Sequence, residues 1–239
     1  AADEGWMPQS EEHLAVLDLL GVRRGVVALT KTDRVDDELV ELATLEILDR
    51  LEGTSLSEAP VIPVSAPTGR GVDELIEALD DLLPEPEQGS DPRLWIDRRF
   101  TAAGAGTVVT GTLLGGPLAV VDTLGTYPGE DEVRVRTLES HEEPRDHVEP
   151  HRRVAAGLVG APDDLDRGAM LGRRGRWRIT DRFTATLRTA RYVEELTDRG
   201  AFQVHMGSAA VPARLRLLDD GAVVTLARGL PARYGDRFI

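Results

Sequence analysis

The segment LTKTD, residues 29–33, places a lysine and an aspartate directly after an apolar run. Lys31 is the only lysine, because all other members of the 28 Lys and Arg residues are arginines. The carboxylate of Asp33 can accept two hydrogen bonds from the N1–H and N2–H₂ edge of guanine, a donor pair that adenine lacks. The Lys31 stem can lie along a purine face or ribose, for which a guanidinium fork is too wide. The alternative is a solvated turn without a ligand, and TKTD alone does not decide between the two.

A second loop, VSAPTGRG at residues 64–71, also follows an apolar run. Its small side chains permit close approach, and the backbone N–H groups that follow Ser65 and Ala66 can bond a purine oxygen. Ligands of parallel sheets bind at the carboxyl ends of the strands, so two such loops on adjacent strands form one pocket. The expected guanine-binding residues are Thr30, Lys31, Asp33, Ser65 and Ala66.

Two apolar runs must position these loops. GVVALT, residues 25–30, is continuous and rich in β-branched side chains, which predicts a strand buried on both faces. APVIPVSA, residues 59–66, predicts a second short buried strand. Because helical patterns alternate with these runs, the sequence indicates βαβ units and a parallel sheet.

Three helical patterns surround the predicted strands. Ser10 is a suitable N-cap for a helix that ends near Gly21. Residues 36–51 show helical spacing with acids in the first turn, and residues 71–83 form another amphipathic pattern. The expected apolar positions of the 36–51 helix are Leu39, Leu42, Ile47 and Leu51.

The chain changes character after residue 83. PEPEQGSDP, residues 84–92, is acidic and Pro-rich, which is typical of an interdomain linker. Residues beyond it alternate or run β-branched between Gly and Pro turns, a pattern typical of antiparallel barrels. The predicted fold class is α/β plus all-β, with an α/β part at 1–83 and β-barrels at 93–172 and 176–239.

The net charge of −14 is unevenly distributed. Residues 1–92 carry 22 Asp and Glu against 6 Lys and Arg, whereas residues 93–239 carry 20 against 22. The acidic part is a poor nucleic-acid surface, and the second part can accept a polyanion. The chain has no cysteine and no apolar run near the roughly 18 residues that suggest a membrane span, so we expect a cytoplasmic protein with no membrane partner.

Taken with their surroundings, the two loops resemble the guanine-recognition loops of translational GTPases. AADEGWMPQSEEHL resembles the segment that follows the third sheet strand of that family. The likeness is greatest to the selenocysteine-specific elongation factors, where LTKTD with Thr30 in place of the usual Asn is typical. Further motifs that carry this resemblance are RLWIDRRFTAAGAGTVVTGTL, VRVRTLESHEEP and QVHMGSAAVPARLRLL.

The resemblance implies the C-terminal part of a P-loop GTPase domain followed by two antiparallel β-barrels. It implies GTP with Mg²⁺, binding of selenocysteinyl-tRNA and its delivery to the ribosome. Asp97, Arg98 and Arg153 match positions of the family's aminoacyl pocket, where guanidinium groups would favour a selenolate. The alternative for these residues is an Asp–Arg pair that only braces a strand.

The chain departs from the family pattern in several places. It contains no GxxxxGK[ST] phosphate loop and no DxPGH segment, so the Mg²⁺ ligands and the catalytic His are not in it. The family's winged-helix modules, which bind a messenger-RNA hairpin, are also absent. We therefore expect a fragment that is inactive alone as a GTPase. The alternatives are a non-catalytic RNA-binding remnant and another elongation-factor-like GTPase of the same plan.

Smaller departures concern turns. Ala102 and Ala103 replace an aliphatic–Lys pair, Val121 replaces a usual turn glycine, and His151-Arg152 replaces a Gly-polar pair. These changes leave the conformation of the local turns undecided, but they do not alter the predicted fold.

Two other motifs are better explained without ligands. GAGTVVTG, residues 104–111, lacks the third glycine and the helix of a dinucleotide site, so a barrel turn is the better interpretation. His141, His147 and His151 lie close in sequence, but their acidic, Pro-containing surroundings favour a solvated loop over a metal site.

Overall fold

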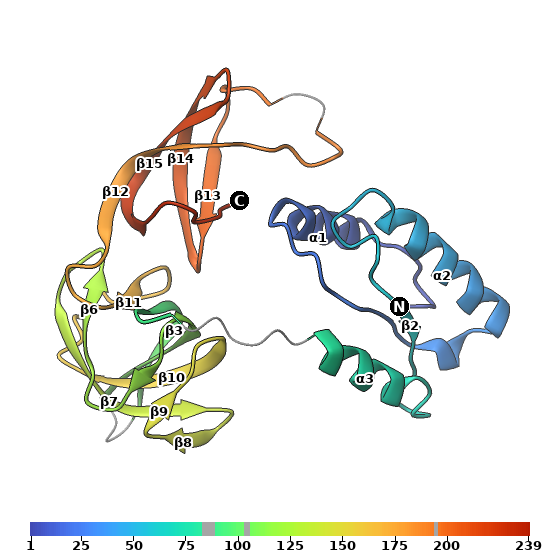
Figure 1. The fold of residues 1–239 in the computed structure, drawn as a ribbon, viewed down its shortest axis with the longest axis horizontal. Helices are drawn as coiled ribbons and strands as arrows, with labels where there is room; N and C mark the ends of the chain where they lie inside the picture. Colours follow the sequence, from blue (N-terminus) through green and yellow to red (C-terminus); the bar gives the residue numbers. More distant parts are fainter. Residues whose placement is uncertain (83–88, 103–105, 194–195) are drawn as a thin grey trace. The chain divides into compact units, whose positions relative to one another are not determined.

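The computed structural model describes residues 1–82, 89–102, 106–193 and 196–239 (Figure 1). The chain divides into two compact units. The first comprises Ala1–Glu85 together with Arg188–Leu196, and the second comprises Pro86–Leu187 together with Thr197–Ile239. The α/β unit therefore contains a segment that is distant from it in sequence. The predicted domain boundaries remain a prediction, and residues 84–88 of the proposed linker lie outside the described residues.

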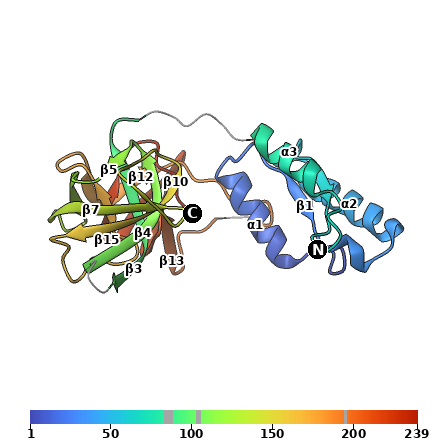
Figure 2. The same cartoon turned by 90° about the horizontal axis from the view of Figure 1, so that it is seen from below.

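The first unit is an α/β structure built on a two-stranded parallel sheet in which Val27 pairs with Val61 and Leu29 pairs with Pro63. Figure 2 shows its helices around the strands. Its elements are α1 (Pro8–Leu19), β1 (Val27–Leu29), the 3₁₀ turn η1 (Thr32–Arg34), α2 (Asp37–Leu51), β2 (Val61–Pro63) and α3 (Val72–Leu82). This parallel pairing places the two loops predicted from sequence at the same edge.

The helix starts show one cap that was not predicted and correct the one that was. Asp36 caps α2, since its side chain accepts a 2.9 Å hydrogen bond from the amide of Leu39. The proposed Ser10 cap is wrong, because α1 begins at Pro8 and Met7 occupies the N-cap without a side-chain bond. Proline suits a first helical turn because its missing N–H would have no intrahelical acceptor there.

The burial predicted for this unit is also corrected. β1 is not buried on both faces, because Leu29 is buried while Ala28 is exposed. On α2 the predicted positions Leu39 and Leu42 are 47% and 62% exposed. The predicted positions Ile47 and Leu51 are buried and confirm that part of the stripe, whereas Val40 packs in place of its neighbour Leu39. The buried residues of α2 are Val40, Ile47 and Leu51.

The second unit contains a large antiparallel sheet with the order β10-β4-β3-β11-β6-β7-β8. An additional pairing of β10 with β7 closes six of these strands into a ring around an apolar core. The small strands β5 (Leu118–Ala119) and β9 (His147–Val148) pair with each other. The strands of the large sheet are β3 (Pro92–Ala102), β4 (Gly106–Gly115), β6 (Thr123–Tyr127), β7 (Glu132–Ser140), β8 (Glu143–Arg145), β10 (Arg152–Val159) and β11 (Met170–Gly172).

The second unit also contains a four-stranded antiparallel sheet with the order β12-β15-β14-β13. No pairing closes this sheet among the described residues, so the predicted pair of barrels stays a prediction. A common apolar cluster joins both sheets through side chains such as Trp95 and Tyr127 of the large sheet and Val211 and Val224 of the four-stranded sheet. The strands are β12 (Arg178–Ala185), β13 (Phe202–Met206), β14 (Ala209–Leu218) and β15 (Gly221–Ala232).

The questioned turns keep glycine-like backbones. Val121 has φ +74° and His151 has φ +65°, both in the left-handed region that disfavours side chains with a Cβ. The substitutions seen in the sequence therefore leave the turn shape in place and introduce local strain instead. Ala103 lies outside the described residues.

The structure also describes most of the glycine-rich motif at residues 104–111 and the His-rich segment at residues 141–151. Residues 106–111 form part of strand β4, and residues 104–105 lie outside the described part. The His-rich segment is not only a solvated loop, because β8 and β9 occur within it. Across the residues that the structure describes, no cluster of His, Asp or Glu has a metal-binding arrangement. None of the described helices has the length and apolar character needed to cross a membrane.

Candidate functional site

The two predicted guanine loops meet at the ends of β1 and β2. The hydroxyl of Ser65 donates a 2.7 Å hydrogen bond to one carboxylate oxygen of Asp33. The amide of Thr32 also donates to the carbonyl of Val64, at 3.3 Å. Ser65 is fully buried whereas Asp33 is exposed, so the bond fixes the orientation of an otherwise mobile carboxylate. The second carboxylate oxygen of Asp33 has no hydrogen-bond partner among the described residues and is available to a ligand.

The backbone donors of the second loop are fewer than predicted. The amide of Ser65 already donates to the carbonyl of Arg70 at 2.9 Å. Pro67, which follows Ala66, has no amide hydrogen. Among these residues only the amide of exposed Ala66 is left to bond a purine oxygen, which corrects the expected pair of donors to one.

Lys31 adopts the left-handed conformation, with φ +60°. Its ammonium lies 3.5 Å from Asp3 and 3.4 Å from Glu4, so it pairs with two carboxylates. Partial burial would raise the pKa of Asp3, but the hydrogen bond from Arg34 and the charge of Lys31 outweigh it and lower that pKa. Exposed Thr30 accepts a 2.8 Å bond from the amide of Ala2 through its carbonyl. The guanine loop is thus tied to residues 1–4.

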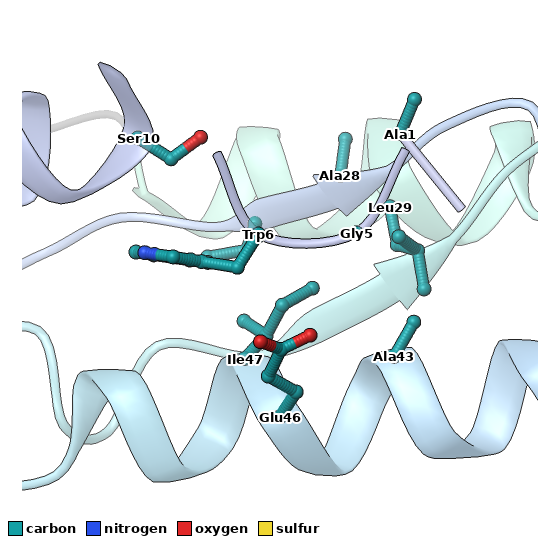
Figure 3. A pocket seen from close by; sticks show the side chains of 10 residues that line it. Ala1, Gly5, Trp6, Ser10, Ala28, Leu29, Ala43, Glu46 and Ile47 are labelled. Carbon is teal, nitrogen blue, oxygen red and sulfur yellow. The ribbon is translucent and has the colours of Figure 1, made fainter. Parts of the chain in front are cut away.

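Sequence reasoning missed two residues beside this loop. Thr32 is only 2% exposed, and its hydroxyl has no hydrogen-bond partner among the described residues. Trp6 lines a cavity of about 140 Å³ between β1 and α2 (Figure 3). Ala43, Glu46 and Ile47 of α2 line the same cavity. The position of Thr32 between Lys31 and Asp33 was a usable signal, whereas nothing local to Trp6 indicated a cavity.

Asp97 and Arg153 also come together, in the second unit. Arg153 binds both carboxylate oxygens of Asp97, with 2.9 Å between Nη2 and Oδ1. The hydroxyl of Thr110 donates to the same Oδ1 at 2.7 Å. The pairing of β3 with β4 shifts register between Ile96 and Arg98, so Asp97 is the bulged residue. A bulge redirects a side chain, and here it brings the carboxylate within reach of a strand two positions away in the sheet.

The electrostatics of this cluster follow from the pair. The hydrogen bond from Arg153 lowers the pKa of Asp97, with further contributions from Thr110 and from the charges of Arg153 and Arg98. The same bond raises the pKa of Arg153. The Asp97 side chain is 25% exposed and that of Arg153 is 52% exposed, so the guanidinium keeps an open side toward solvent. Arg98 is exposed, and no ion pair to it occurs among the described residues.

The chain is similar to known proteins over its whole length. Residues 1–85 match the family model described as "Elongation factor Tu GTP binding domain". The selenocysteine-specific elongation factor of Desulfomicrobium baculatum is 38% identical over 100% of this chain. The chain is a homologue of the selenocysteine-specific elongation factors. The protein of that name from Escherichia coli K12 is 36% identical over 92% of the chain.

A solved structure extends the family relationship to the fold. The structure of translation elongation factor SelB from Methanococcus maripaludis in complex with the GTP analogue GppNHp has a TM-score of 0.87 and 26% identity. It covers 99% of this chain, which in turn covers 59% of that structure. The chain spans 40% of the D. baculatum relative and 36% of the E. coli relative. The agreement supports a translation-factor fold that is mainly β-sheet.

Proposed function

We propose that this chain supplies guanine recognition and the tRNA-binding β-structure of a selenocysteine-specific elongation factor. In this role the cytoplasmic protein binds GTP with Mg²⁺, holds selenocysteinyl-tRNA and delivers it to the ribosome. Homology over the full length of the chain supports the family role. The observation that carries the specific proposal is the cluster of Asp97, Thr110 and Arg153 with Arg98 beside it, because it presents guanidinium groups where the family's aminoacyl pocket is expected.

The guanine base is recognised by the free oxygen of Asp33 and the amide of Ala66. Ser65 holds the Asp33 carboxylate in one orientation, so less rotational freedom is lost when a base binds. Adenine would leave that carboxylate without its donor pair, which costs binding free energy. This chain contributes only the base contacts, because its sequence has no phosphate loop for Mg²⁺ and the phosphates.

The aminoacyl group is recognised at the open side of Arg153. Asp97 occupies one edge of the guanidinium and fixes its plane, while the other N–H groups can donate to a selenolate. Because Asp97 neutralises much of the Arg153 charge, the exposed guanidinium of Arg98 supplies the net positive charge. A serine hydroxyl carries no charge and gains less from either arginine.

Arg153→Ala in the full-length, GTP-bound protein tests this assignment. Affinity for selenocysteinyl-tRNA should fall by roughly 10- to 150-fold, corresponding to about 1.5–3 kcal/mol for a charged hydrogen bond. Affinity for the same tRNA charged with serine should stay nearly constant. Both dissociation constants must be measured at one salt concentration, because phosphate contacts depend on salt.

Arg152→Ala is the matched control. Arg152 is the exposed neighbour of Arg153 on β10, and no ion pair to it occurs in the described part of the chain. Its loss should affect both charged tRNAs equally or not at all. An equal loss for both tRNAs in Arg153→Ala would make Arg153 a phosphate contact and would contradict the selenocysteine pocket.

A further inference from the structure

The α/β unit includes the segment Arg188–Leu196, which follows β12 in the chain and lies far from residues 1–85 in sequence. Arg191 anchors it to α1. Its Nε donates to Glu11 Oε1 at 2.8 Å, and its Nη2 donates to the same oxygen at 2.5 Å. Its Nη1 donates to the carbonyl of Arg50 at 3.1 Å. One guanidinium thus binds the first turn of α1 and the last turn of α2.

Arg188 makes a second attachment at the other end of α1. Its Nη2 lies 3.3 Å from the carbonyl of Asp18 and 3.8 Å from the Asp18 carboxylate. The last carbonyls of a helix lack intrahelical donors and carry the negative end of the helix dipole. Arg188 and Arg191 therefore supply cations and donors to the C-terminal ends of α1 and α2.

Glu11 has two further partners besides Arg191. Its Oε2 accepts a 3.0 Å hydrogen bond from the indole N–H of Trp6, and the Nη1 of Arg50 lies 3.8 Å from the same oxygen. The hydrogen bond from Arg191 lowers the pKa of Glu11. Trp6 lines the cavity of Figure 3 and lies two residues after Glu4, which together with Asp3 pairs with Lys31. Arg191 is thus connected to the guanine loop through Glu11, Trp6 and the residues that pair with Lys31.

We infer that Glu11 and Asp18 form a docking surface for residues 188–193, and that this contact is a releasable ionic latch on the nucleotide-binding unit. The Glu11 and Arg191 side chains are 25% and 39% exposed, so water and salt screen their attraction. None of the described residues from Arg188 to Val193 is buried. Polar contacts without an apolar anchor are weak enough to open. Opening removes Arg191, one of the three partners of Glu11, and so leaves the carboxylate that accepts from Trp6 less well ordered.

Limited trypsin digestion of the 239-residue chain tests the latch, because trypsin cleaves after arginine. Glu11→Gln should accelerate cleavage after Arg188 and Arg191 by about 2- to 5-fold, the size expected for a partly exposed ion pair. Cleavage after exposed Arg199 in the same chain is the internal reference. Raising the salt concentration should reduce the difference between the variant and the unsubstituted chain.

Glu12→Gln is the matched control, since it removes the same charge from the neighbouring exposed residue. It should leave cleavage unchanged. Amide hydrogen exchange supplies the second readout, and Glu11→Gln should speed exchange in residues 1–6 by a similar factor. Unchanged cleavage in Glu11→Gln, or the same acceleration in Glu12→Gln, would overturn the latch. Faster cleavage with unchanged exchange in residues 1–6 would overturn its connection to the guanine loop.

Discussion

Asp236→Ala should be among the most destabilising changes in the second unit. Asp236 accepts bonds from Arg93 Nη1 at 2.6 Å and from Nη2 at 2.8 Å. The two side chains are only 11% and 9% exposed. The guanidinium also lies 5.2 Å from the ring centre of Trp95 and 4.5 Å from that of Trp177. Removing the carboxylate would leave a guanidinium enclosed between two indoles without its counter-charge.

The magnitude follows from that enclosure. Breaking a buried ion pair by removing one partner costs about 3–5 kcal/mol, because the remaining charge stays desolvated. Arg93 keeps a 3.1 Å bond to the carbonyl of Pro231 and keeps its ring contacts, which places the expected loss near the lower value. A loss of about 3 kcal/mol lowers the melting temperature of a unit of this size by roughly 6–12 °C.

The assay is thermal and urea unfolding followed by tryptophan fluorescence in a Trp6→Phe background. Trp95 and Trp177 then report only the second unit, because Trp6 belongs to the first. Asp91→Ala is the control, since Asp91 pairs with Arg173 at 3.3 Å but all parties are more exposed. It should cost at most about 1 kcal/mol. Equal losses in Asp236→Ala and Asp91→Ala would refute the claim that burial controls the energy of these pairs.

Three further predictions address strain, base choice and pH. Val121→Gly should raise the free energy of unfolding by about 1 kcal/mol, because glycine accepts φ +74° without the Cβ penalty; a lower stability in urea would show that no strain is stored there. In the full-length protein, Asp33→Asn should shift preference from guanine to xanthine nucleotides by a few kcal/mol in a competition assay, and unchanged guanine preference would reduce TKTD to a turn. The pKa of Asp97 is lowered in the folded state, so its pair with Arg153 stabilises above the unfolded pKa of about 3.9 and is lost as pH falls through the lower folded value. The stability difference between the unsubstituted chain and Arg153→Ala, measured by urea unfolding, should therefore vanish at the acid end of that window and not at neutral pH.

The parts of the fold that follow from local pattern could be predicted. The parallel pairing of β1 and β2 follows from two apolar runs separated by a helical period. The Asp36 cap of α2 also follows from local sequence. What failed was burial, because the face of α2 that packs depends on the partner surface. Leu39 is as apolar as Val40, and only the position of the sheet decides which of them is buried.

The candidate sites show the same division between local and distant information. The guanine-binding role of Asp33 stays a prediction from a four-residue motif, whereas the bond of the Ser65 amide to Arg70 depends on how the loop closes. The contact of Asp97 with Arg153 joins positions 56 residues apart through a bulge that no local pattern indicates. The attachment of Arg191 to Glu11 spans 180 residues and left no signal in either segment.

Burial decides what a carboxylate–guanidinium pair can do in this chain, since the same chemistry occurs in three settings. The Arg93–Asp236 pair is almost enclosed, so opening it leaves a desolvated charge and only unfolding relieves it. The Asp97–Arg153 pair is half open, which lets one partner orient the other while donors stay free for a ligand. The Glu11–Arg191 pair lies on the surface of a segment without a buried side chain, so water can replace either partner. Removal of Asp236 should therefore cost more measured stability than removal of Asp97 or Glu11, whose side chains are both 25% exposed. A loss for Asp97 or Glu11 as large as that for Asp236 would mean that geometry rather than desolvation sets these energies.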